Sequence, residues 1–129
     1  MAVTPIGLGL DDILKEDEPM TAEQGVMVEY IGPTKKAGNP MFVTKTGKPC
    51  LYLKFKVVDH PEQTGKELLY MATIGEFTLS DFAKVIPEPF SDAGFDDEAG
   101  VGAVVKVNVE VKEVNGKPRN NIKFVERVN

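Results

Sequence analysis

Tyr52, Lys54 and Lys56 occupy alternate positions in the middle of the chain, and the positions between them are apolar. Residues two apart in an extended strand share one face, so this pattern predicts a strand with an apolar inner face and a ring beside two cations on its outer face. An exposed ring offers a surface on which an unpaired base stacks, while lysines neutralise phosphates without reading sequence. These residue types at this spacing therefore indicate binding of a single-stranded polynucleotide.

The segment around this strand is strongly basic. Residues 30–58 hold six lysines and no Asp or Glu, although the whole chain of 129 residues has a formal net charge of −5. Residues 1–29 carry −6, residues 59–100 carry −8 and residues 101–129 carry +3. The field of the basic segment reaches roughly 8 Å at physiological salt, which is enough to attract a polyanion. Lysines in an exposed loop also serve solubility alone, so charge by itself leaves both interpretations open.

The strands that must position these side chains are predicted from the alternation of apolar and polar residues and from the turn residues between them. They are residues 25–31, 50–58, 66–74, 105–112 and 120–125, with a brief strand at 41–43 inside a long loop at 33–49. Residues 66–74 are apolar on both faces, so we expect both faces to be covered. Asn115-Gly116 predicts a tight hairpin between the last two strands.

One helix is predicted after the third strand, because Leu79, Phe82 and Ile86 share a face at helical spacing. Thr78 is the candidate N-cap, and Asp81 takes the place of the acid in a capping box. Two prolines follow directly and end the helix.

This order predicts an all-β fold with one short helix: a five-stranded antiparallel Greek-key barrel of the OB-fold type, with the helix between strands 3 and 4. Closing the sheet removes its exposed edges, and the helix fills one end. An open sandwich is the alternative. OB-folds bind oligonucleotides on strands 2 and 3 and with the loops that join strands 1–2 and 4–5, so we expect a site there.

The candidate nucleic-acid-binding residues are the cations and aromatic rings of the basic segment and of the last hairpin. They are Lys35, Lys36, Phe42, Lys45, Lys48, Tyr52, Lys54, Lys56, Lys117, Arg119 and Lys123. Structural roles are open for several of them, because Phe42 can fold onto the core and strand lysines can guard an edge against aggregation. We expect Tyr30 and Tyr70 to be core aromatics.

Three stretches resemble a known family: CLYLKFKVVD (50–59), ELLYMATIGEFTLSDFAKVI (67–86) and VKVNVEVKEVNGKPRNNIKFV (105–125). Through them the chain resembles the small phage-encoded single-stranded DNA-binding proteins of OB-fold type, over about residues 25–127. The resemblance implies sequence-independent protection of single-stranded DNA during replication, recombination or repair, with no catalysis. An RNA-binding OB domain stays open, because nothing in the sequence marks recognition of the 2′-hydroxyl.

The organisation expected is an acidic N-terminal arm at residues 1–24 followed by a nucleic-acid-binding domain at residues 25–129. The arm is a candidate contact for homo-oligomers. Many proteins of the family carry an acidic tail that recruits partners, whereas the last residues here are IKFVERVN. The arm and the acidic residues 92–98 are therefore the candidate contacts for replication or recombination proteins. A protein-interaction or assembly module built on the same barrel is the alternative to DNA binding.

Motifs for other chemistries are incomplete. The glycines at 7 and 9 lack the third glycine of a dinucleotide site, His60 has no nucleophile placed beside it, and the acids at 96–98 lack the spacing of a calcium loop. We expect no enzyme activity, cofactor or metal. The single Cys50 and the lack of a targeting signal or an apolar stretch of about 20 residues predict a cytoplasmic protein, in the host cell if phage-encoded, with no membrane contact.

Overall fold

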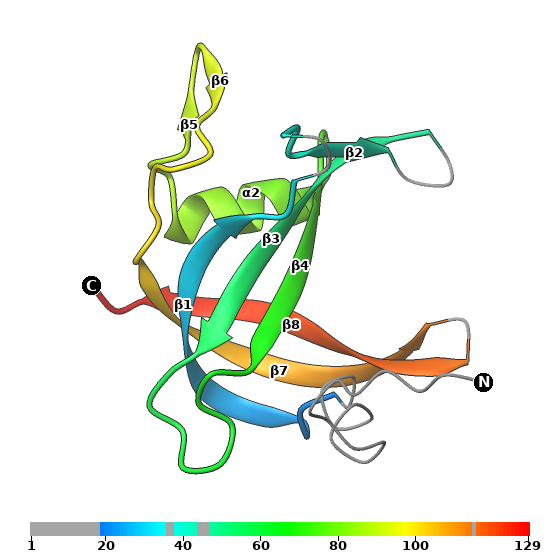
Figure 1. The fold of residues 1–129 in the computed structure, drawn as a ribbon, viewed down its shortest axis with the longest axis vertical. Helices are drawn as coiled ribbons and strands as arrows, with labels where there is room; N and C mark the ends of the chain where they lie inside the picture. Colours follow the sequence, from blue (N-terminus) through cyan, green and yellow to red (C-terminus); the bar gives the residue numbers. More distant parts are fainter. Residues whose placement is uncertain (1–18, 36–37, 44–46, 115) are drawn as a thin grey trace, which may run out of the picture.

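The computed structural model describes residues 19–35, 38–43, 47–114 and 116–129. They form a mostly β, antiparallel structure with one short helix (Figure 1). The elements are β1 (Glu23–Pro33), β2 (Met41–Val43), β3 (Pro49–Val57), β4 (Glu67–Thr73), α2 (Phe77–Val85), β5 (Phe90–Ser91), β6 (Gly94–Phe95), β7 (Val104–Val114) and β8 (Lys117–Arg127). The five long strands and the helix follow the predicted order, whereas the β5–β6 hairpin was not predicted.

The main sheet is strongly curved because β1 belongs to both of its halves (Figure 1). Its strands are ordered β2-β3-β1-β7-β8, and β4 pairs with the other side of β3. The first half of β1 pairs with β7 and its second half with β3, and the register shifts once in each half. Gly25 and Gly32 lie at these shifts with φ values of 71° and 107°. Such positive φ angles favour glycine, and bulges of this kind bend a strand.

The prediction of a closed barrel is wrong. In the described residues no backbone pairing joins β4 to β8, the two long strands that end the series. The rings of Tyr70 on β4 and Phe124 on β8 instead meet across this opening, with centroids 4.7 Å apart. The two edges are therefore joined by side-chain packing and not by a backbone ladder.

The core lies inside the curved sheet and is built around Phe82 of α2. The Phe82 side chain is fully buried, and its ring packs at 5.3 Å from Tyr30 and 6.2 Å from Phe55. Tyr70 and Phe124 complete the cluster at 6.5 and 6.1 Å. Tyr30 and Tyr70 are core aromatics, as predicted. Burial of these rings holds the helix against one end of the sheet.

The start of α2 differs from the prediction. The helix begins at Phe77, and its N-cap residue Glu76 makes no side-chain capping bond. The Thr78 hydroxyl oxygen, predicted to cap the helix, accepts a hydrogen bond from the Thr73 backbone N–H at 3.0 Å instead. The Tyr70 hydroxyl donates to the Thr78 carbonyl at 2.7 Å. Thr78 therefore joins the helix to β4.

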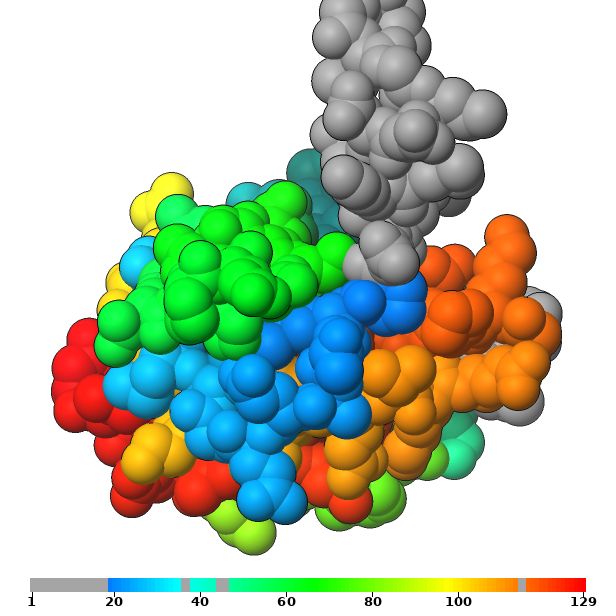
Figure 2. All heavy atoms as spheres, turned by 90° about the horizontal axis from the view of Figure 1, so that it is seen from below, coloured from blue at the N-terminus to red at the C-terminus, as the bar shows by residue number. Residues whose placement is uncertain are grey.

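β1 begins at Glu23, two residues before the predicted start, and ordered contacts extend back to Met20. The Met20 side chain is buried, and its backbone makes a two-bond pair with Asn120, the N–H donating at 2.8 Å and the carbonyl accepting at 2.7 Å. Figure 2 shows β1 lying against β7 on this face of the molecule. The remainder of the predicted arm, residues 1–18, lies outside the described residues.

Candidate nucleic-acid interface

The outer face of β3 carries the predicted aromatic and basic residues. Leu51, Leu53 and Phe55 are buried. Tyr52, Lys54 and Lys56 occupy the alternate positions, where they are half-buried, half-buried and exposed. The strand period therefore places them on one outer face, as predicted.

The neighbouring face of β4 is open to solvent, so the prediction that β4 is covered on both faces is wrong. Met71 is 44% exposed and lies opposite Tyr52, while Leu69 is 49% exposed and lies opposite Lys54. Sequence reasoning missed both as site residues. The sequence did contain a sign of them, because both faces of this strand are apolar. That pattern is typical of a covered strand, but it also occurs where an apolar face is exposed for binding.

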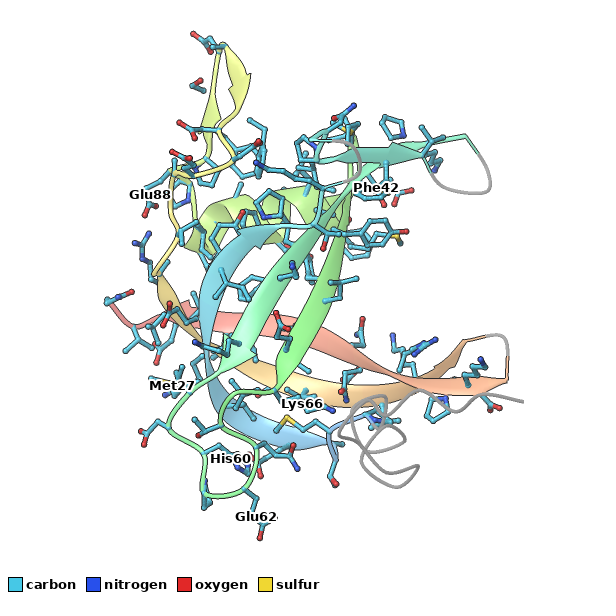
Figure 3. All side chains as sticks on the ribbon, in the orientation of Figure 1. Met27, Phe42, His60, Glu62, Lys66 and Glu88 are labelled. Atoms are coloured by element: carbon cyan, nitrogen blue, oxygen red, sulfur yellow. The ribbon has the colours of Figure 1, made fainter. Side chains whose placement is uncertain are left out.

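Phe42 and Tyr52 form an aromatic pair at one end of this face. The Phe42 ring lies 5.1 Å from the Tyr52 ring in an edge-to-face arrangement. Phe42 comes from β2, where it stands opposite the fully buried Cys50 (Figure 3). The Tyr52 phenol is uncharged at neutral pH, and burial, and secondly the Cys50 thiol, raise its pKa further above the ordinary value of 10.0. An uncharged ring on a half-exposed surface is suited to stacking on a base.

The loop lysines are partly neutralised by carboxylates from other parts of the chain. Lys35 Nζ lies 2.8 Å from Asp97 Oδ2, and Lys48 Nζ lies 2.7 Å from Glu76 Oε1. Neither acid belongs to the basic segment, so charge counting along the sequence could not reveal these pairs. Lys36 and Lys45 lie outside the described residues.

The two lysines of β3 differ from the loop lysines. Across the described chain, no carboxylate lies within ion-pair distance of Lys54 or Lys56. The cross-strand partners of Lys56 are Glu29 and Glu67, whereas Lys54 stands opposite Gly32 and Leu69. Lys54 is therefore the strand cation with the fewest acidic neighbours, and the one best placed to meet a phosphate.

The β7–β8 hairpin supplies a second group of cations. Lys117 and Arg119 are exposed near its end, and Lys112 is the cross-strand partner of Arg119. Lys112 was not predicted as a site residue, because strand pairing was needed to place it. Lys123 lies farther down β8 and forms an ion pair with Glu110 at 3.3 Å. The hairpin pairing supports the predicted turn, of which Asn115 lies outside the described residues.

The hairpin and β2 project from the same side of the molecule, to the right in Figure 1, with β3 and β4 between their bases. The β5–β6 hairpin stands at the top left of the same view.

His60 has a structural role in the β3–β4 loop, far from Phe42 (Figure 3). Its Nδ1 accepts hydrogen bonds from the backbone N–H groups of Glu62 and Gln63, each at 3.0 Å. Its Nε2 faces the Glu23 carboxylate at 3.0 Å. Both ring nitrogens are thus engaged in holding the loop and the start of β1.

No three His, Cys, Asp or Glu side chains in the described ranges are grouped so that they could hold a metal ion. Within the same ranges, no helix has the length and apolar composition needed to cross a membrane. No family model, curated protein or solved structure matches this chain significantly.

Proposed function

We propose that this protein binds single-stranded DNA without sequence preference and protects it during replication, recombination or repair, as the phage-encoded proteins it resembles do. The observation that carries the proposal is the open β3–β4 face, on which Tyr52, Met71 and Leu69 adjoin Lys54. An exposed apolar surface beside unpaired cations suits a ligand with stacked bases and a charged backbone.

The strand arrangement supports an OB-type fold for this domain. Five long strands, a helix between the third and fourth, and a first strand shared by two half-sheets match that architecture. The opening between β4 and β8 is compatible with it, because OB barrels are partly open. Such folds bind on the face of their second and third strands, here β3 and β4, and with the flanking loops.

Binding would combine two contributions. A base stacked on Tyr52 is worth about 1–3 kcal/mol, and Met71 extends the apolar surface on which the next base lies. Lys54 and Lys56, together with the hairpin cations, neutralise phosphates and release counterions. Neither contribution distinguishes one base from another, which accounts for the lack of sequence preference.

Two other functions stay as alternatives. An RNA-binding domain would use the same face, and competition between oligo-dT and oligo-U would show it as a preference for the ribose strand. A protein-interaction module would bind neither oligonucleotide, and any contact it made would lack the steep salt dependence of polyphosphate binding.

A titration of labelled dT oligomers at two or more salt concentrations tests the proposal. We expect log K to fall with log salt, by a slope of about −0.7 for each phosphate contacted. Lys54→Ala should make the slope shallower by about that amount. Lys84→Ala is the matched control, because Lys84 lies on α2, 75% exposed, and pairs with Asp81. Absence of binding by the unaltered protein at low salt would refute the function.

A further inference from the structure

Exposed apolar side chains, here called the apolar track, recur along the chain from β4 to the start of the helix. Leu69 and Met71 on β4 are followed by Ile74 in the turn, 39% exposed, and by Phe77 at the first position of α2. Phe77 is 74% exposed, more than any other large apolar side chain in the described ranges. A phenyl ring left in water gains no stabilisation from folding, whereas burying it under a ligand would, and several exposed apolar side chains together mark a binding surface.

The helix does not need the Phe77 ring in order to fold. Its inward stripe consists of Leu79, Phe82 and Ile86, and Thr78 makes the bonds to β4. The Phe77 side chain makes no ring contact with another described aromatic residue. The Phe77 ring therefore contributes little to the packing of the core.

A cation is held at the residue that precedes Phe77. Glu76, the residue before Phe77, accepts a hydrogen bond from Lys48 Nζ at 2.7 Å. The Ile74 backbone N–H donates to the Pro49 carbonyl at 3.0 Å, which joins the turn to the start of β3. The basic segment and the apolar track therefore meet where β4 passes into α2.

We propose that Phe77 is a second base-stacking residue, which takes the bound single strand off the β3–β4 face and onto the start of α2. The inference rests on the proposed function. Lys48 Nζ lies 2.7 Å from Glu76 Oε1, so a phosphate of that strand would have to compete with this carboxylate for the ammonium group. Unpaired bases are the occupant that fits best, because a cation stands toward each end of the track: Lys54 opposite Leu69, and Lys48 bound to Glu76, the residue before Phe77.

A tryptophan at position 77 tests this directly, because the chain contains no tryptophan. In Phe77→Trp, dT oligomers of about 16 nucleotides should quench the indole emission with the same midpoint as binding measured by anisotropy, since one OB domain covers about 4–16 nucleotides. Val125→Trp is the control, because Val125 is 51% exposed on β8 and lies outside the track. Its emission should change little.

Phe77→Ala should weaken binding of the 16-nucleotide oligomer by about fivefold to 160-fold, the loss expected for one stacked base, and leave the salt slope unchanged. The thermal unfolding midpoint should stay near that of the unaltered protein. A 4-nucleotide oligomer, which can bind without using the whole site of one OB domain, should lose less affinity.

The two proposals fail in different ways. If Phe77→Ala binds the long oligomer normally and the indole at position 77 is not quenched, while Lys54→Ala weakens binding, Phe77 is not a stacking residue and the DNA-binding function stands. If the unaltered protein binds no oligomer, both proposals fall. If Phe77→Ala changes only the sedimentation of the free protein, the ring serves contact between copies of this chain, and the inference is overturned.

Discussion

Tyr52 is the residue at which the stacking and charge contributions to binding can be separated. Its ring is uncharged and half-exposed, and it lies between Met71 on the next strand and Phe42 on β2. Its place on the outer face was predictable, because the two-residue period of a strand is a local property. The exposure of Phe77 and Met71 was not, because it depends on which surfaces the rest of the chain leaves uncovered.

Replacing Tyr52 by alanine should cost about 1–3 kcal/mol of binding free energy and leave the dependence of log K on log salt unaltered. Tyr52→Phe should retain most of the affinity, because the ring is kept. Both can be measured by anisotropy titrations at several salt concentrations. A shallower salt slope in Tyr52→Ala would show that the ring acts by positioning the lysines instead.

At the scale of elements, the segment between β6 and β7 lies against the base of the basic loop. Asp97 holds Lys35, and a Cβ at Gly32 would meet Val101 at 3.8 Å, so this connector packs directly on β1. A bound phosphate would compete with Asp97 for the Lys35 ammonium group. The connector therefore lowers the positive charge available at the site.

Asp97→Asn should strengthen binding of dT oligomers a few-fold and steepen the salt slope, by up to about 0.7 if Lys35 then engages a phosphate. Asp92→Asn is the control. It removes the same charge from the exposed turn of the β5–β6 hairpin, where no ion pair with a described residue forms. Equal effects of the two changes would mean that net charge alone is responsible.

The link between α2 and β8 is sensitive to acid. Arg127 donates to Glu88 Oε1 at 2.6 Å, which holds the pKa of this carboxyl below its ordinary value of 4.5. A lowered folded-state pKa contributes stability above that value, and the contribution is lost as the pH falls through the folded pKa. The pair is partly exposed, so its share of the free energy of unfolding is less than about 1 kcal/mol.

Glu88→Gln should therefore be slightly less stable than the unaltered protein at pH 7, by at most about 1 kcal/mol, and the difference should vanish as the pH falls through the folded-state pKa. Urea unfolding at a series of pH values measures this difference. Glu62→Gln, in the exposed β3–β4 loop, should show no such convergence. A difference that stayed constant with pH would exclude the ion pair as its cause.

At the scale of the whole molecule, the sequence predicted the order of the elements but not the closure of the sheet. Strands, helix and hairpin follow from periodicity and turn residues within short windows. Closure depends on the distance between β4 and β8, which is set by how Tyr70, Phe124 and Phe82 pack together from distant parts of the chain. The ion pairs of Lys35 and Lys48 escaped prediction for the same reason.

Phe124 should stabilise the side-chain packing that bridges β4 and β8 where the sheet is open. Phe124→Ala removes the ring that contacts Tyr70 at 4.7 Å and Phe55 at 5.6 Å, and should lower the free energy of unfolding by about 3 kcal/mol. Val125→Ala, on the opposite face of the same strand, should change it by no more than about 0.5 kcal/mol. Urea denaturation of the two variants decides whether side-chain packing alone holds the edges together.

Cys50 gives the protein an internal reporter of local opening. It is the one sulfhydryl in the chain, is fully buried, and lies opposite Phe42 in the short β2–β3 pairing. A disulfide reagent such as dithionitrobenzoate can reach it only when the structure opens locally, for example when β2 separates from β3. The rate of thiol modification under native conditions thus measures how often β2 separates from β3. An oligonucleotide bound across β2 would slow that rate.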